Sequence, residues 1–205
     1  VYTSEKYSSS RSKYSPLVLK SDDGGETWET IYTSPDKAMF TSITTDKTGN
    51  VYLAMRSAAI GGKLVALKYS GIGTSWNYIG SNEGISSDTA NHISIKVHNG
   101  KMYAACKDFG VGGAVVYVCS LKTGVWEALG NSAASEGDAS DIDLLISQSG
   151  TIYISYCDES FSRKTSVRYY DATEGWKYLG SRGISSDIGT YPKLAETDDG
   201  IAVLY

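Results

Sequence analysis

The sequence predicts an all-β fold, a β-propeller built from four-stranded antiparallel blades. Three observations predict it. Four tryptophans, Trp28, Trp76, Trp126 and Trp176, follow one another at separations of 48, 50 and 50 residues. Similar sequence surrounds them, and short aromatic or β-branched runs alternate with Gly, Asn, Asp and Ser. A repeat of this length with several short strands is typical of a propeller blade.

The repeat is visible in the residues that follow each tryptophan. The last three copies read WNYIGSNEGISSD, WEALGNSAASEGD and WKYLGSRGISSD, and the copy at Trp28, WETIYTSPD, is degenerate. Turn-plus-strand copies recur at the same period, as DKTGNVYLAM, NGKMYAAC, QSGTIYISYC and DDGIAVLY. Several matched features at one period indicate repeated units of one supersecondary structure.

Each repeat contains four expected strands, named A to D from the innermost outward. We expect strand A at 40–46, 93–99, 143–149 and 193–199, and strand B, after a hairpin turn, at 51–56, 102–107, 151–157 and 201–205. We expect strand C at 15–21, 63–70, 114–120 and 166–171. Strand D carries the tryptophan and ends near Gly80, Gly130 or Gly180. No helix longer than about two turns is expected in such a fold.

The chain, residues 1–205, is interpreted as one propeller domain or a propeller fragment. It begins and ends in the register of strand B, since Val1 and Tyr2 align with Val51 and Tyr52. A strand near 191–197 beside 1–5 closes a four-blade ring and leaves 201–205 unused. Alternatively, the four blades belong to a larger ring or pair with a second copy. Unpaired strand edges are unfavourable, so we expect 201–205 to pair outside a simple four-blade monomer.

Composition argues against several classes of function. The net charge is −4, the sequence pI is about 5.2, and no basic run is present, which disfavours nucleic acid as a partner. The longest apolar stretch, near 114–119, is far shorter than a membrane span. Cys106, Cys119 and Cys157 lack metal-site spacing, so we expect buried thiols, with a Cys106–Cys119 bridge as the alternative. No metal or cofactor is expected.

Propeller topology predicts where a ligand site lies. The A–B and C–D turns share one face, and the longer B–C and D–A loops share the other, here called the mouth face. Long loops on a rigid scaffold carry binding residues disproportionately. The candidate ligand-binding residues on this face are Arg56, Lys107, Asp108, Asp158, Arg163, His92, Asp141 and Tyr191. Phe40, His92, Asp141 and Tyr191 occupy equivalent positions at the start of strand A. The alternative interpretation is that the charges are merely solvated and that Asp108 and Asp158 cap the B–C turns.

The first C–D turn resembles the Asp-box of sialidases and other propellers, S-x-D-x-G-x-T-W. The matching residues are Ser21, Asp23, Gly25, Thr27 and Trp28. The resemblance implies a structural role: Asp23 accepts backbone hydrogen bonds, the glycines adopt positive φ, and the tryptophan anchors the hairpin in the blade stack. The whole repeat also resembles tandem repeats of secreted or surface bacterial proteins, which implies an extracellular, cell-surface or periplasmic location.

Sialidase chemistry, which the resemblance suggests, needs an arginine cluster for the substrate carboxylate, and the five arginines of the chain do not form one in the sequence. We therefore predict a non-catalytic binding or scaffold propeller with a glycan or a protein as ligand. The alternative is part of a polysaccharide-acting glycoside hydrolase or lyase, with paired carboxylates drawn from Asp108, Asp141, Asp158 and Glu159. Further partners are a second copy or the remaining blades of a larger propeller.

Overall fold

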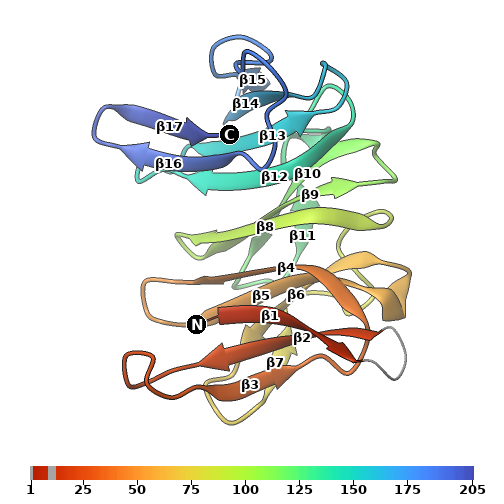
Figure 1. The fold of residues 1–205 in the computed structure, drawn as a ribbon, viewed down its shortest axis with the longest axis vertical. Helices are drawn as coiled ribbons and strands as arrows, with labels where there is room; N and C mark the ends of the chain where they lie inside the picture. Colours follow the sequence, from red (N-terminus) through yellow and green to blue (C-terminus); the bar gives the residue numbers. More distant parts are fainter. Residues whose placement is uncertain (1, 9–12) are drawn as a thin grey trace.

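The computed structural model describes residues 2–8 and 13–205 and shows an all-β chain (Figure 1). Its only helical elements in these residues are two three-residue 3-10 turns, η1 (Ala58–Ile60) and η2 (Leu129–Asn131). Val1 and positions 9–12 of the first B–C loop lie outside the described residues. The expectation that the chain contains no long helix is confirmed there.

Three sheets have four antiparallel strands each, in chain order from the inner to the outer edge. The first of them consists of β4 (Ala38–Thr45), β5 (Val51–Ser57), β6 (Lys63–Tyr69) and β7 (Trp76–Tyr78). The second consists of β8 (Ala90–His98), β9 (Lys101–Asp108), β10 (Gly113–Ser120) and β11 (Trp126–Ala128). The third consists of β12 (Ala139–Ile146), β13 (Ile152–Asp158), β14 (Lys164–Asp171) and β15 (Gly175–Tyr178). The predicted fold class, a propeller with four-stranded antiparallel blades, is confirmed.

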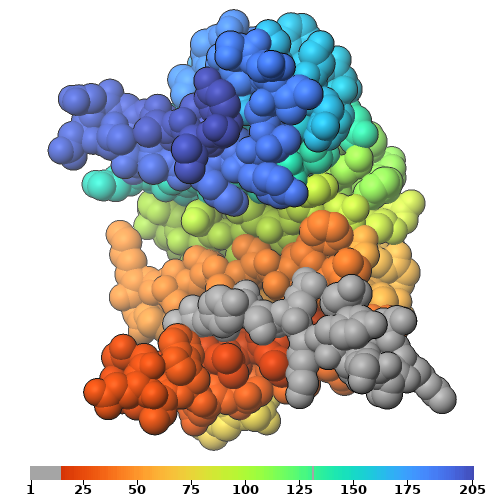
Figure 2. Space-filling model, in the orientation of Figure 1, coloured from red at the N-terminus to blue at the C-terminus, as the bar shows by residue number. Residues whose placement is uncertain are grey.

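The two ends of the chain form smaller sheets. The first is β1 (Tyr2–Ser8), β2 (Lys13–Lys20) and β3 (Glu29–Thr33), and the last is the hairpin β16 (Lys193–Thr197) and β17 (Gly200–Leu204). The first sheet and this hairpin lie at opposite ends of the long axis (Figures 1 and 2). In the described residues β1 pairs with β2 and β16 with β17, so the strand pairing that would close a four-blade ring is not formed.

The core lies between adjacent sheets rather than within any one of them. Side chains alternate across a strand, so successive residues enter different cores. On β10, Val115 belongs to the cluster shared with the sheet of β4–β7, whereas Val116 belongs to the cluster shared with the sheet of β12–β15. Seven of the eight residues of β10 are buried for this reason. A blade therefore reaches its stable packing only between two neighbours.

Tryptophan and glycine form a repeated contact at these interfaces. The indole Nε1 of Trp76 donates to the carbonyl of Ile31 at 2.8 Å, and that of Trp126 donates to Ile79 at 2.7 Å, in each case in the preceding blade. Gly80 lies directly beneath Trp126: a Cβ there would stand 2.7 Å from its Cδ1 and 2.5 Å from the Gly124 carbonyl oxygen. The glycine in the repeat is thus required by the close approach of the next blade.

Trp28 does not share this role, which corrects the expectation that this tryptophan anchors its hairpin in the blade stack. Its side chain is 49% exposed, whereas Trp176 is 8% exposed and packs in a core between sheets. The Trp28 indole donates to the Gly25 carbonyl within its own turn, at 3.1 Å. No sheet precedes the first one in the described residues, so this indole has no neighbouring blade to pack against.

The turn from Ser21 to Trp28 has the hydrogen bonds that its sequence predicts. Asp23 Oδ1 accepts the backbone N–H of Thr27 at 3.0 Å, and Oδ2 accepts the Thr27 hydroxyl at 2.5 Å. Gly24 and Gly25 have φ of 76° and 101°, which other residues rarely adopt. Asp23 is therefore engaged in the turn, as expected for a structural residue.

Two further features follow the sequence-based expectations. All three cysteines are buried and free, and burial raises the pKa of each thiol. The Cys106–Cys119 bridge is not formed, because Cys106 lies opposite Val115 and Cys119 opposite Met102. Within the described residues no helix has the length and apolar character needed to cross a membrane.

The glycine contact gives a stability test with a matched control. Gly80→Ala places a methyl group against Trp126, whereas Gly180→Ala, at the same repeat position, meets nothing within 4 Å. Both glycines have positive φ, 81° and 83°, so the backbone strain of the two substitutions is alike. We expect Gly80→Ala to lower the unfolding free energy by about 1–3 kcal/mol more than Gly180→Ala, measured by urea denaturation. Equal losses would contradict the interface role of Gly80.

The tryptophans give a second test. Trp126→Ala removes an indole that packs on the neighbouring blade, and we expect it to cost about 3–5 kcal/mol. Trp28→Ala removes a half-exposed indole and is expected to cost less than half as much. Thermal unfolding followed by circular dichroism measures both, and a Trp126→Ala protein with an unchanged melting temperature would refute the packing role.

Candidate functional site

A β-bulge recurs near the start of three inner strands, β4, β8 and β12. The register shifts between Met39 and Ser42 on β4, between Asn91 and Ser94 on β8, and between Ser140 and Asp143 on β12. The bulge places two residues opposite one, which bends the strand and re-aims a side chain. The name bulge residues is used here for Phe40, His92 and Asp141, which lie in these bulges, together with Tyr191, which has the same repeat position.

The four bulge residues all have left-handed backbone conformations. Phe40, His92, Asp141 and Tyr191 have φ of 52°, 53°, 49° and 52°. Tyr191 occupies the same repeat position just before β16. Positive φ is uncommon for residues other than glycine and is unfavourable for a bulky aromatic. Because the same unusual conformation recurs at one position of four successive repeats, it is a regular feature of the fold, and it directs one side chain from each repeat toward the same region.

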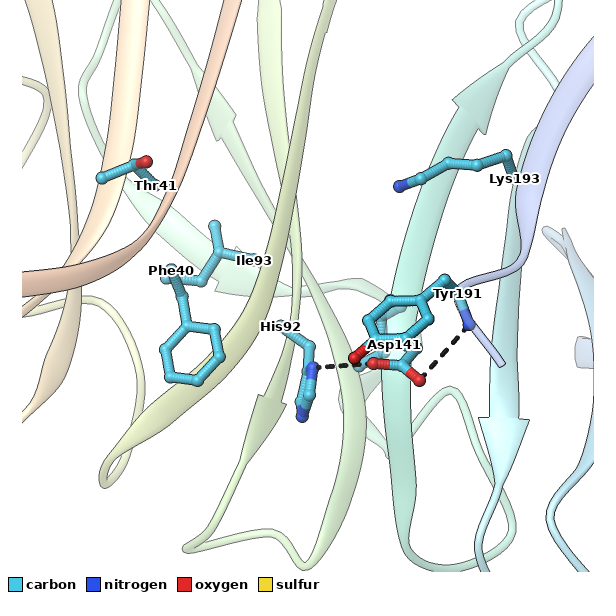
Figure 3. A pocket seen from close by; sticks show the side chains of 8 residues that line it. Phe40, Thr41, His92, Ile93, Asp141, Tyr191 and Lys193 are labelled. Carbon is cyan, nitrogen blue, oxygen red and sulfur yellow. Dashed lines mark hydrogen bonds and ion pairs between the residues drawn. The ribbon is translucent and has the colours of Figure 1, made fainter. Parts of the chain in front are cut away.

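These side chains line one pocket, the mouth pocket, of about 300 Å³ (Figure 3). Its lining consists of the four bulge residues with Thr41, Ile93, Ile142 and Lys193. The volume lies at the small end of ligand pockets in proteins. Inner strands from four successive units contribute to it, so residues as far apart in the sequence as Phe40 and Lys193 meet at one place.

The bulge residues form a continuous row of contacts. The rings of Phe40 and His92 lie 5.3 Å apart between centroids, and His92 Nδ1 lies 3.5 Å from Asp141 Oδ1. Asp141 Oδ2 accepts the backbone N–H of Tyr191 at 3.3 Å. At the other end, the Arg56 guanidinium carbon lies 5.0 Å from the centroid of the Phe40 ring. Two aromatic rings therefore flank a polar pair.

The imidazole of His92 is held in its neutral form. Burial lowers the pKa of His92 most strongly, and the nearby ammonium of Lys107 lowers it further, against the opposing effect of Asp141. At neutral pH one ring nitrogen therefore carries a proton and the other is an acceptor.

Hydrogen bonds between blades hold the row in place. Each involves the residue that follows the bulge, Ser42, Ser94 or Asp143, whose side chain accepts the backbone N–H of Ile95, Leu144 or Leu194 on the next inner strand. The distances are 3.2, 3.2 and 2.9 Å. Lys193 also pairs with Asp143, at 3.3 Å. Sequence reasoning did not find these bonds; a polar residue two places after each bulge residue was the available signal.

Buried serines fix the D–A loops that lead into the bulges. Ser86 Oγ accepts the N–H of Leu64 at 2.9 Å and donates to the Asp88 carbonyl at 2.6 Å. Ser135 and Ser185 make the same pair of bonds, to Ala114 and Gly137 and to Thr165 and Asp187. The loops of the mouth face are thus pinned to strands β6, β10 and β14, which gives the bulge residues a rigid base.

Asp108 was expected among the ligand-binding residues, but its side chain is buried in the structure. Its side chain is fully buried and accepts from the backbone N–H groups of Ser87, Asp88 and Gly110 and from the hydroxyls of Ser87 and Tyr117. Burial alone would raise the pKa of this carboxyl; the donors, Tyr117 foremost, outweigh burial and lower it. Asp108 therefore anchors two loops, as the alternative interpretation held.

Asp158 has a similar position in the next blade. It is 1% exposed, and its carboxylate accepts from Arg182 Nε at 2.8 Å and from Arg182 Nη2 at 3.0 Å. This bidentate pair ties the loop after β15 to the end of β13. A carboxylate enclosed in this way does not line the mouth pocket.

The remaining candidates lie on the mouth face outside the pocket lining. Lys107 pairs with Asp138 at 2.5 Å and stands 4.7 Å from the centre of the Phe109 ring. Arg163 pairs with Glu159 at 3.2 Å. Arg56 covers Phe40 and donates to Asn91 at 2.5 Å.

Of the eight candidates, the structure brings His92, Asp141 and Tyr191 together in the pocket. No cluster of His, Cys, Asp and Glu able to hold a metal occurs in the described part of the chain.

Solved structures that match this fold include enzymes and a protein of unknown function. A Penicillium chrysogenum alpha-L-arabinanase complexed with arabinobiose aligns with a TM-score of 0.57 at 17% identity, over 98% of this chain and 70% of that one. The Hadza microbial sialidase Hz136 aligns with a TM-score of 0.57 at 15% identity, over 88% of this chain and 39% of that one. A protein of unknown function from Dyadobacter fermentans gives 0.58 at 14% identity, over 93% and 67%.

These likenesses show the propeller fold. The chain spans less than half of the sialidase that it resembles. No protein-family model matches the sequence, and no curated protein matches it.

The structural role of Asp108 can be tested. Asp108→Asn puts an amide where five donors converge, and we expect a loss of about 2–4 kcal/mol of stability at pH 7. Because the folded pKa of Asp108 is depressed, its stabilising effect is present above about pH 4 and is lost as pH falls further. The difference in melting temperature between wild type and variant should therefore shrink in acid. A difference independent of pH would contradict this assignment.

Proposed function

We propose that this chain is a carbohydrate-binding propeller whose ligand site is the mouth pocket. The observation that carries the proposal is the row of four bulge residues, which turns two aromatic rings and a polar His–Asp pair into one pocket of about 300 Å³. Sugars offer apolar ring faces for stacking and hydroxyls for hydrogen bonds, so such a lining matches them. The fold shared with a sialidase and an arabinanase supports this class of ligand.

The proposed role is binding without catalysis. Glycosidases generally use two carboxyl groups, about 5–9.5 Å apart, on either side of the scissile bond. Among the described residues that line the mouth pocket, Asp141 is the only carboxylate. Asp143 is engaged by Lys193 and by the N–H of Leu194. Of the other carboxylates considered from the sequence, Asp108 and Asp158 are buried in loop anchors, and Glu159 pairs with Arg163 and accepts the Ser140 hydroxyl outside the pocket lining.

The alternative is part of a polysaccharide-acting hydrolase or lyase. The contact between His92 and Asp141 favours it, since a histidine beside a carboxylate can transfer protons. Under that alternative a second carboxylate comes from blades beyond those described or from a partner chain.

The proposal includes an extracellular or cell-surface location, where polysaccharides are met. We also propose that the unpaired edges of β1 and β17 pair with further blades or with a second copy of the chain, because an exposed strand edge tends to pair with another strand.

Tyr191→Asn tests the binding site. Tyr191 is 73% exposed, and asparagine tolerates its positive φ, so we expect the fold to persist while stacking is lost. On an array of plant, microbial and host glycans, binding by wild type should fall about tenfold or more in the variant. The matched control is Ile72→Asn, on the opposite face and 78% exposed, which should bind like wild type.

The same glycans distinguish binding from hydrolysis. Release of reducing ends by wild type, lost in Asp141→Asn, would establish the enzyme alternative. Binding with no release supports the proposal, and absence of binding by wild type to every glycan refutes it.

A further inference from the structure

The His92–Asp141 pair presents hydrogen-bond acceptors to the mouth pocket. His92 Nδ1 faces Asp141 at 3.5 Å, and Nε2 lies on the far side of the ring (Figure 3). A carboxylate beside Nδ1 favours the proton on that nitrogen, which leaves the Nε2 lone pair free. No described residue donates a hydrogen bond to Nε2. The histidine side chain is 25% exposed, so this acceptor can be reached by a ligand.

Asp141 supplies the second acceptor and a negative charge. Its one recorded hydrogen bond is from the Tyr191 N–H to Oδ2, and no Lys or Arg of the described residues pairs with it. A carboxylate accepts at about four positions, and the Asp141 side chain is 10% exposed at the pocket, so an acceptor position remains for a ligand. Two neighbouring acceptors match a pair of hydroxyl donors on a sugar.

No lysine or arginine of the described residues forms an ion pair with Asp141. Two cations near the pocket pair with other carboxylates, Lys193 with Asp143 and Lys107 with Asp138, while Arg56 lies over the Phe40 ring and donates to the neutral amide of Asn91. The charged groups that act on His92 are Asp141 from β12, Lys107 from β9, and Glu159 and Asp138 from neighbouring loops, while Phe40 from β4 is apolar. A second negative charge placed beside His92 would therefore meet the carboxylate of Asp141, which no described lysine or arginine pairs with.

We propose that the mouth pocket selects neutral sugars over acidic ones, with His92 Nε2 and the Asp141 carboxylate accepting two hydroxyl hydrogens of the ligand. This inference rests on the proposed carbohydrate-binding function and adds its specificity. Rejection of an acidic sugar comes from Asp141, since like charges brought together out of water repel strongly.

Matched sugar pairs test the selection. The probes are lactose with sialyllactose, and xylotriose with the same trisaccharide carrying glucuronic acid, titrated by calorimetry at pH 7. We expect wild type to bind the neutral member at least about tenfold more tightly. Asp141→Asn keeps the size and tolerates positive φ, and it should reduce this preference to about twofold or less. Asp22→Asn, on the opposite face, is the control and should keep the wild-type preference.

The histidine gives an independent readout. Protonation turns Nε2 from an acceptor into a donor, so affinity for the neutral member should fall as pH decreases from 7 to 5. The burial that lowers the pKa of His92 puts this fall on the acid side of neutrality. His92→Asn retains an acceptor but does not titrate, so its affinity should be nearly constant across the same range. Calorimetry at several pH values measures both proteins.

The outcomes separate this inference from the proposed function. Equal or tighter binding of the acidic member by wild type, or a preference unchanged in Asp141→Asn, overturns the inference and leaves carbohydrate binding intact. If His92→Asn keeps the wild-type pH profile, His92 is not the acceptor. If wild type binds none of these four sugars and none on the glycan array, both fail.

Discussion

The rest of this structure depends on the packing of one blade against the next. The sheets β4–β7 and β8–β11 each bury both faces, and three apolar cores lie between neighbouring sheets. The indole-to-carbonyl bonds of Trp76 and Trp126 join the outer strands, and Gly80 provides the space that the second of these indoles needs. Where a neighbour is absent from the described residues the contact is open, as at Trp28 and Gly180. Stability in such an array is largely a sum of these interfaces.

The same stacking produces the candidate site at the inner edge. Because blades are arranged side by side, one unusual backbone position per blade becomes a row of neighbouring side chains. The positive φ of the bulge residues costs on the order of 1–3 kcal/mol each, and the surrounding hydrogen bonds must hold it. Ser42, Ser94 and Asp143 do so between blades, and Ser86, Ser135 and Ser185 hold the loops that lead in. Strain kept at one position of every unit is typical of a functional site.

Burial separates the acidic residues of the mouth face into two kinds. Asp108 and Asp158 are buried, and their carboxylate oxygens accept hydrogen bonds from neighbouring loops and strands, so both carboxylates stabilise the fold. Asp141 lines the pocket beside the neutral imidazole of His92. This difference in burial explains why a site rich in acidic sequence positions offers one carboxylate in the pocket.

The sequence by itself determined the fold class, the repeat and the strands, because strand alternation and turn residues act locally and recur every 50 residues or so. It also placed Phe40, His92, Asp141 and Tyr191 at equivalent positions and predicted the hydrogen bonds of the Asp23 turn. Only the tertiary structure decided that Asp108 and Asp158 are enclosed, that Trp28 stands apart from the other tryptophans, and that no closing strand pair joins β1 to β16 in the described residues. Each of these depends on which blade lies beside which, and burial by a distant neighbour leaves no local pattern in the chain.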